Sequence, residues 1–210
     1  NSSSATQGTT AGTETGSAAG DAAGTDAAAS ASDMNVMLET PVESLDPQQA
    51  TDGTSFEVIA DYTDGLMQMD ADGQAVPAIA ESYDLSDDGL TYTFHLRTDA
   101  KWSNGDDVTS ADFKNTIVRA LDPNCKSGYS SMLYPIAGAE EMYNGTGDES
   151  GLGVDTSDDK TIVFNLKEPC AYFEQLFVLP VYMPTHRELQ TETNGDWAMG
   201  NDMDALVSCG

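Results

Sequence analysis

Alternation of apolar and polar residues is the clearest pattern in this chain, and it predicts strands joined by tight turns. In Thr91–Arg97 every second residue is large and apolar, as expected for a strand with one buried face. We predict that Glu81–Leu85 pairs with this strand through a turn at Asp87-Asp88-Gly89. Glycine suits that turn because it tolerates a positive φ angle.

Shorter apolar runs predict the other strands. Residues 66–69 and 74–77 flank Asp72-Gly73, which favours a second hairpin. A third strand pair is predicted at residues 153–155 and 161–166. Two continuous apolar runs, at residues 34–40 and 178–183, are predicted to be buried strands.

Two helices are predicted from helical apolar spacing next to capping residues. Ser55–Asp64 has this spacing, and Thr54 or Ser55 is expected to cap its N-terminus. Thr109 and Asp112 have the spacing of a capping box, in which the two residues satisfy each other's free backbone N–H groups. We therefore expect a second helix to begin immediately after Thr109.

The order of elements predicts a mixed α/β (α+β) domain over residues 34–210. Ala171–Phe177 and a short charged stretch beginning at His186 are also expected to be helical, so helices and strands are interspersed along the chain. Residues 1–33 have no aromatic residue and no Lys or Arg, and they consist mostly of Ser, Thr, Ala and Gly. Such a segment cannot bury enough apolar surface to offset the entropy lost on ordering, so we predict a disordered low-complexity tether.

The charge balance excludes two classes of partner. The chain has 36 acidic and 8 basic residues, for a formal net charge of −28. A nucleic acid or an anionic lipid surface would be repelled by this charge. The acidic residues are interpreted as a solvated surface, and the alternative is that they steer cationic ligands. We find no apolar run of membrane-spanning length and no signal peptide, so an export signal and any lipid-bearing cysteine are expected upstream of Asn1.

Nothing in the sequence predicts a catalytic or metal centre. The cysteines Cys125, Cys170 and Cys209 match no zinc or redox spacing, and they are expected to be separate structural thiols, with a Cys125–Cys170 disulfide as the alternative. His95 and His186 lie near no hydrolase or zinc-protease motif, and both are expected to be structural. Trp102 is likewise expected to be a structural residue. Asp70, Asp72 and Gly73 are interpreted as a hairpin turn, since the ligand spacing of a calcium loop is missing.

Several sequence blocks, in this order, resemble the solute-binding proteins of peptide and nickel ABC transporters (family 5, typified by oligopeptide- and dipeptide-binding proteins). The blocks are Ser44-Leu45-Asp46-Pro47, Asp64-Gly65-Leu66, Pro77–Tyr83, Thr91–Arg97 running into Ala100–Gly105, and Val108–Phe113. The resemblance covers residues 34–210. It implies the N-terminal lobe of a periplasmic-binding-protein-like class II fold. Because family members are longer and have two lobes, we expect this chain to lack the C-terminal lobe.

The resemblance also implies a function in ligand binding and not in catalysis. It predicts an extracellular component of an ABC importer that binds peptides through their backbone in a cleft between the lobes, with no catalytic residue, no metal and no cofactor. The expected partners are a peptide and the permease subunits, and the expected state is a monomer. The expected location is the extracellular face of the cell membrane, through a lipid anchor of the Gram-positive type, or the periplasm. The residues that align with the family's ligand contacts are Ala50, Thr51, Asp52, Gly53, Thr54 and Tyr129.

Alternatives remain open at this stage. The polar stretch 50–54 would otherwise be an ordinary loop, and Tyr129 an ordinary half-buried core residue. The same fold could bind a nickel chelate, haem or an oligosaccharide, or it could act as a receptor for a peptide signal. A hydrolase is disfavoured because no nucleophile and base occur at a recognisable spacing. Without its second lobe, the chain could also bind nothing.

Overall fold

The computed structural model describes residues 37–38, 40–187, 189, 198 and 206–209. All of these except Met37 belong to one compact unit, Leu38–Gly210. The predicted tether of residues 1–33 and most of the predicted strand at 34–40 lie outside the described residues. For the described residues Met37 and Leu38 the prediction of a strand is wrong, since both are exposed and neither lies in a strand. A strand is stable only when a neighbouring strand takes up its backbone hydrogen bonds.

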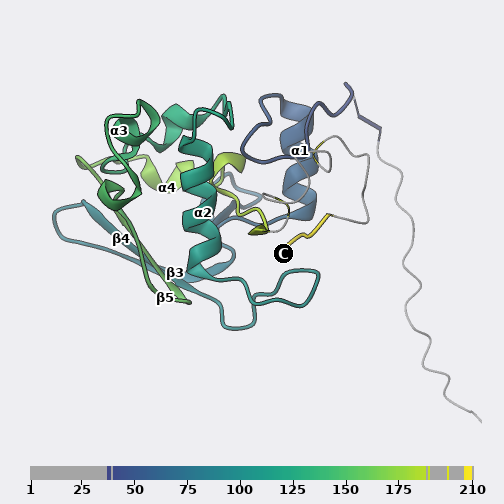
Figure 1. Ribbon diagram of the computed structural model, residues 1–210. Helices are drawn as coiled ribbons and strands as arrows, with labels where there is room; N and C mark the ends of the chain where they lie inside the picture. The colour runs from purple at the N-terminus through teal and green to yellow at the C-terminus, as the bar shows by residue number, and fades with distance from the viewer. Residues whose placement is uncertain (1–36, 39, 188, 190–197, 199–205, 210) are drawn as a thin grey trace, which may run out of the picture. The chain divides into compact units, whose positions relative to one another are not determined.

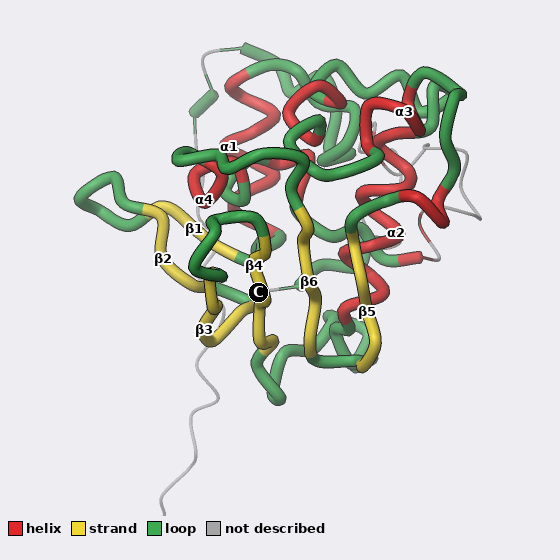
Figure 2. Tube along the Cα trace, turned by 90° about the vertical axis from the view of Figure 1, so that its left-hand side faces the viewer, coloured by secondary structure: helices red, strands yellow, loops and turns green. Residues whose placement is uncertain are grey.

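An antiparallel four-stranded sheet carries most of the core, in the order β3-β4-β6-β5. Figure 2 shows β4, β6 and β5 side by side, with α2 next to β5. Both predicted strand pairs of this sheet are confirmed, including the turn in which Gly89 has a φ of 71°. The strands are β3 (Ala80–Leu85), β4 (Thr91–Leu96), β5 (Val154–Asp158) and β6 (Thr161–Asn165).

The alternating pattern of β4 explains why this strand lies at the centre of the core. Its apolar positions Tyr92, Phe94 and Leu96 are buried, while the positions between them are half-buried. The Phe94 ring lies 5.9 Å from that of Phe164 on β6 and 4.7 Å from that of Phe177. Edge-on ring contacts of this kind add to the gain from burying the rings.

Helix α2 (Ser110–Leu121) begins as the capping box predicts. The carboxylate of Asp112 accepts hydrogen bonds from the backbone N–H and the hydroxyl of Thr109, at 2.8 and 3.0 Å. It also accepts from Trp102 Nε1 at 3.3 Å, which fixes this buried indole as a structural residue. Figure 1 shows α2 at the centre of the unit, with α1 on one side and α3 and α4 on the other.

Helix α1 (Gly53–Tyr62) starts two residues earlier than the sequence predicts. Its cap is Asp52, which accepts a hydrogen bond from the Ser55 backbone N–H, so the predicted caps Thr54 and Ser55 are wrong. Both lie inside the first turn instead. Aspartate is a strong cap because its side-chain oxygen reaches a free N–H of the first turn.

The other predicted hairpin is confirmed, and a predicted strand is replaced. Strands β1 (Met67–Met69) and β2 (Ala75–Pro77) form the hairpin, with Gly73 at a φ of 76°. The strand predicted at residues 178–183 is wrong, because 180–182 form a 3₁₀ helix (η3) with Pro180 at its start. Proline has a fixed φ angle and no N–H, which suits a helix start and not a paired strand.

Four more short helices complete the described unit. They are η1 (Ser130–Leu133), α3 (Ala139–Tyr143), η2 (Glu149–Gly151) and α4 (Phe173–Leu176). Helix α4 confirms the helix predicted near 171–177, although it is shorter. The charged stretch predicted from His186 is helical at Arg187 and Leu189. Among the described residues, no helix combines the length and the apolar character that crossing a membrane requires.

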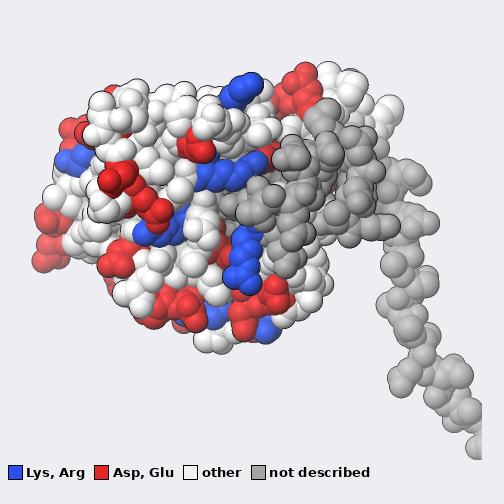
Figure 3. All heavy atoms as spheres, viewed as in Figure 1, with Lys and Arg blue, Asp and Glu red and all other residues white. Residues whose placement is uncertain are grey.

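The cysteines are unpaired and the charges are dispersed. Cys125 and Cys170 are half-buried free thiols, so the alternative of a disulfide between them is wrong, and Cys209 is a buried free thiol. On the face seen in Figure 3, acidic and basic side chains are interspersed. Three of the lysines, Lys101, Lys114 and Lys167, form ion pairs with Asp107, Glu149 and Glu140.

Candidate ligand-binding site

The structure brings together the two chain segments that contain the predicted ligand contacts. Residues 49–56 lie beside residues 125–129, and we call this contact the seam. A Cβ atom at Gly128 would lie only 2.7 Å from Thr51 Cγ2, so a larger residue at position 128 would force the Thr51 side chain to move. The rings of Phe56 and Tyr129 meet edge to face, with centroids 5.3 Å apart.

The predicted residues differ in what they can offer to a ligand. Thr51 and Gly53 are exposed, and Asp52, Thr54 and Tyr129 are half-buried. Apart from its chain neighbours and the backbone of α1, no described residue has a heavy atom within 4 Å of the position that a Cβ at Gly53 would occupy. An approaching molecule could therefore reach the backbone at the start of α1.

Ala50 and Thr54 already have partners within the protein. Ala50 is 2% exposed and packs with Ile59 and Met183, so only its backbone could contribute to a site. The Thr54 hydroxyl lies 2.6 Å from that of Thr40, in the segment that crosses the start of α1. Both contacts help to fix the conformation of the stretch 50–54.

Asp52 and Ser127 carry polar atoms that lack partners. The Ser55 hydroxyl and the Ser55 backbone N–H bond to the Asp52 carboxylate and hold the pKa of Asp52 below its usual value. The second carboxylate oxygen, Oδ2, is shielded from solvent and has no hydrogen-bond partner among the described residues, and the same is true of Ser127 Oγ. Buried polar atoms in native proteins nearly always have a partner, so this pair is unusual.

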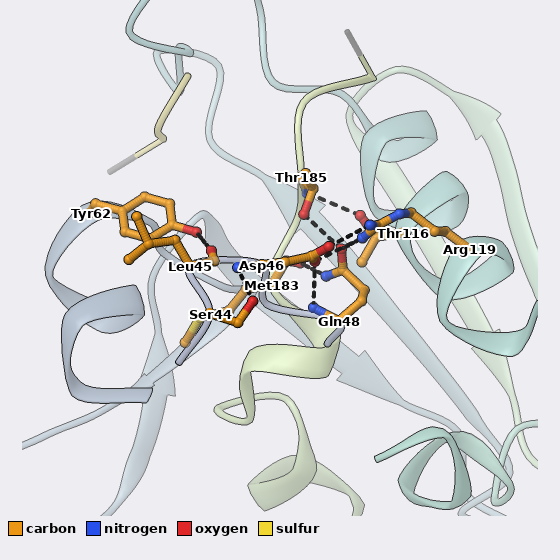
Figure 4. A network of polar contacts seen from close by, with 9 residues as sticks. All are labelled: Ser44, Leu45, Asp46, Gln48, Tyr62, Thr116, Arg119, Met183 and Thr185. Atoms are coloured by element: carbon orange, nitrogen blue, oxygen red, sulfur yellow. Dashed lines mark hydrogen bonds and ion pairs between the residues drawn. The ribbon is translucent and has the colours of Figure 1, made fainter. Parts of the chain in front are cut away.

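A buried ion pair holds the loop that leads into the seam. Asp46, from the block Ser44–Pro47, is 0% exposed, and Arg119 on α2 bonds to it with both terminal nitrogens. Figure 4 shows this pair and the side chains around it. The bond from Arg119 Nη1 to Asp46 Oδ1 is 2.8 Å long. Two parallel hydrogen bonds fix orientation as well as distance.

Gln48 extends the network to a third segment of the chain. Its Oε1 accepts hydrogen bonds from Arg119 Nη1 and from the Thr185 hydroxyl, both at 2.7 Å, and its Nε2 donates to the Met183 carbonyl at 3.0 Å. The Thr185 backbone N–H donates to the Thr116 hydroxyl at 3.1 Å. The network thus connects the loop before the seam, helix α2 and residues 183–185 (Figure 4).

Sequence reasoning missed the residues that support the site. Arg119 stands 73 positions from Asp46, and Thr185 stands 137 positions from Gln48. Local patterns explain Arg119 equally well as a basic residue in the last turn of a helix. Ser127 carries no sequence signal of its own, because its unusual state comes only from its surroundings.

Two cavities lie outside the seam. One of about 460 Å³ opens beside η1 and is lined in part by Met132, Tyr134, Cys170 and Tyr172. A smaller one of about 190 Å³ lies beside Trp102 and His186. His186 is buried with Nε2 3.3 Å from Asp106 Oδ2, and His95 on β4 lies 2.9 Å from Asp84. Within the described residues, no group of three or more His, Cys, Asp or Glu side chains could hold a metal ion.

Comparisons with known proteins find a matching family model and similar sequences. The family model described as bacterial extracellular solute-binding proteins, family 5 (middle) matches residues 74–210. The oligopeptide-binding protein OppA of Bacillus subtilis is 39% identical over 164 residues, which cover 78% of this chain and 30% of that protein. The dipeptide-binding protein of Lactococcus lactis is 34% identical over 165 residues, which cover 79% of this chain and 30% of that protein.

A solved structure gives the same result for the fold. Listeria monocytogenes OppA bound to peptide superposes with a TM-score of 0.74 at 34% identity, covering 78% of this chain and 32% of that chain. The chain therefore spans about 30% of the length of the curated relatives it matches. The mixed α/β fold predicted from the sequence is that of part of such a protein.

Proposed function

Because this chain belongs to the bacterial extracellular solute-binding proteins of family 5, we propose that it forms part of a protein that captures peptides for an ABC importer. The observation that carries the proposal is the seam. Two segments that align with ligand contacts of the family meet there, and they expose Thr51 and the backbone of Gly53 at a helix start.

The proposed mode of binding explains how one site accepts many peptides. Every peptide carries the same backbone N–H and C=O groups, so a site that bonds to the backbone is insensitive to sequence. Side chains then occupy hydrated space, where water completes their hydrogen bonds. No bond in the peptide is made or broken, so the proposal requires neither a catalytic residue nor a cofactor.

The proposals on the lobe, the partners, the oligomeric state and the tether rest on membership of the family. We assign the 34–210 segment to the N-terminal lobe, and the cleft would form between it and a second lobe. Closure of two lobes over a ligand is a known way to signal occupancy to a partner. The partners would be the permease subunits, the protein would act as a monomer, and residues 1–33 would serve as a tether near a lipid anchor.

Substitution of Gly53 tests whether peptides bind at the seam. A Cβ atom at Gly53 would meet open space among the described residues, so Gly53→Leu is expected to fold normally and to block an approaching peptide. We expect peptide affinity, measured by calorimetry, to fall at least about tenfold, with an unchanged melting temperature. Gly151→Leu is the matched control, because Gly151 in η2 is also exposed and has equally open space around it.

Three results would contradict the proposal. Unchanged affinity in Gly53→Leu would remove the seam from the binding site. Binding of a nickel chelate, haem or an oligosaccharide, with no binding of any peptide, would replace the proposed ligand. Cleavage of the added peptide, detected by mass spectrometry of the mixture, would show an enzyme instead of a binding protein.

A further inference from the structure

The larger cavity, of about 460 Å³, has the size of a small-molecule site, since such sites measure about 300 to 1,000 Å³. One wall comes from residues within 131–135, and the other comes from residues 167–172 and Leu176 of α4. Neither wall includes a residue of the seam.

Hydrogen bonds outside the cavity hold its walls in place. The buried Tyr182 donates its hydroxyl to the Met132 carbonyl at 2.9 Å, which fixes the end of η1. The Lys167 backbone N–H donates to the Pro135 carbonyl at 3.0 Å, which joins the two walls to each other. The cavity is therefore formed before any ligand arrives, and its binding costs little reorganisation.

Exposed apolar side chains gather at this cavity. Tyr172 is 58% exposed and Met132 is 36% exposed, and both line it, together with the half-buried Tyr134. The other large apolar side chains that are exposed in the described part of the chain belong to other segments: Met37, Leu38, Met69 and Leu85. Aromatic rings and a thioether are polarisable surfaces, which suit a large and weakly hydrated group.

The charges around the cavity favour a cation. Lys167 Nζ pairs with Glu140 Oε2 at 3.3 Å, whereas Glu168, also in the lining, forms no ion pair with a described residue. Hydrogen bonding to the Cys170 side chain raises the pKa of Tyr172 above its usual value, and the Glu168 carboxylate adds to this shift. The negative charge of Glu168 therefore acts on an aromatic side chain of the same cavity.

We propose that this cavity binds a quaternary ammonium group, with its methyl groups against Tyr134, Tyr172 and Met132 and its charge balanced by Glu168. The face of an aromatic ring carries negative charge density and attracts such a cation. The net charge of −28 attracts the cation from a distance. The inference does not depend on the proposed function, because the cavity and the seam share no residue.

Alkylation of Cys170 reports on occupancy, because this half-buried free thiol lines the cavity. The chain is treated with iodoacetamide, an uncharged reagent, at increasing concentrations of choline, and mass spectrometry of a digest gives the rate for each cysteine. Cys125 is the internal control, since it is also free and half-buried but lies in the seam. The matched neutral ligand is 3,3-dimethyl-1-butanol, which has carbon in place of the charged nitrogen of choline.

We expect choline to slow alkylation of Cys170 and not of Cys125, with a half-saturating concentration at least about fivefold below that of the neutral alcohol. Equal half-saturating concentrations for the two compounds would overturn the assignment of a cation. Absence of protection by choline, or equal protection of Cys125, would overturn the site itself.

Substitutions at Tyr172 separate the effect of its ring from that of its hydroxyl. Tyr172→Phe keeps the aromatic face and is expected to keep the protection by choline, whereas Tyr172→Leu is expected to raise the half-saturating concentration about fivefold. Each variant is compared with itself without ligand, so a changed basal reactivity of Cys170 does not affect the result. Equal values in wild type and both variants would overturn the role assigned to the ring.

Two sources of the quaternary ammonium group are distinguished by phosphatidylcholine vesicles, which present the choline head group on a lipid surface. Stronger protection of Cys170 by vesicles than by free choline, at equal head-group concentration, would support the site and identify a lipid as the source. Stronger protection by free choline would support the site and identify a small molecule.

Discussion

At the scale of single residues, a buried ion pair joins Asp46 to Arg119. The side chain of Asp46 is 0% exposed and that of Arg119 is 18% exposed. Removing two charges from water is costly, and the cost is offset only where geometry is good and the remaining polar atoms are bonded. Gln48 supplies part of that bonding through its contact with Arg119. The pair therefore serves to position the loop before the seam.

Arg119→Met is expected to destabilise the chain by about 3–5 kcal/mol, because it leaves Asp46 buried and unpaired. The double variant Asp46→Asn/Arg119→Met should recover part of that loss, since no buried charge remains. Urea unfolding followed by circular dichroism measures both. Lys101→Met is the control, because its ion pair with Asp107 is exposed and should change the midpoint little. An Arg119→Met midpoint close to that of Lys101→Met would contradict the role of the buried pair.

At the scale of elements, the described segment 206–209 connects parts that are distant in sequence. The Asp64 backbone N–H donates to the Cys209 carbonyl at 2.7 Å, and that of Ser103 donates to the Ser208 carbonyl at 2.8 Å. Isolated bridges also join Cys209 to Thr63 in parallel and to Trp102 in antiparallel orientation. The segment therefore fastens the end of α1 to the turn that follows β4.

The Cys209 thiol makes this contact sensitive to high pH. Burial, more than any other cause, raises the pKa of Cys209 from 9.0 to about 11. The unfolded chain then loses this proton at lower pH than the folded chain, so the contribution is complete below about pH 9 and is lost as the pH rises toward 11. We expect the stability of wild type relative to Cys209→Ala to decline over that range, as measured by urea unfolding at pH 8, 9, 10 and 11. A constant difference between the two proteins would contradict this account.

At the scale of the whole molecule, the charge balance affects which ligands approach. A chain with a net charge of −28 attracts cations through a potential that salt screens within about 10 Å at 0.1 M. This effect acts on the rate of encounter more than on the contacts made after binding.

Peptides with several Lys or Arg residues are therefore expected to associate faster than uncharged peptides at low salt. Raising sodium chloride from about 0.02 to 0.5 M should remove most of this advantage, because the Debye length falls several-fold. Stopped-flow measurement of association rates checks the prediction, and an uncharged peptide of equal length is the control. An advantage that does not depend on salt would contradict steering by the net charge.

Much of the fold could be predicted from the sequence because its signals are local. The alternation in Thr91–Arg97 and the capping box at Thr109 and Asp112 describe interactions between near neighbours. The errors arose where a local pattern had two outcomes. The run at 178–183 is as apolar as a buried strand, but within the described part of the chain it pairs with no strand, and a 3₁₀ helix begins at Pro180.

The candidate site could be predicted only in part. Family resemblance supplied residues 50–54 and Tyr129, and the structure places these two segments in contact. The support from Arg119 and Thr185 and the orphaned atom of Ser127 could not be predicted, because partners 70 or more positions apart leave no periodic trace.

The sequence by itself determined the three antiparallel strand pairs, the positive-φ turns at Gly73 and Gly89, the start of α2 and the excess of acidic residues. These properties depend on neighbouring residues or on composition. Only the tertiary structure decided that Asp52 caps α1, that Asp46 pairs with Arg119, and that residues 49–56 lie beside residues 125–129. The physical reason is that hydrogen bonding and desolvation depend on which atoms surround a group in space, and folding brings those atoms from distant parts of the chain.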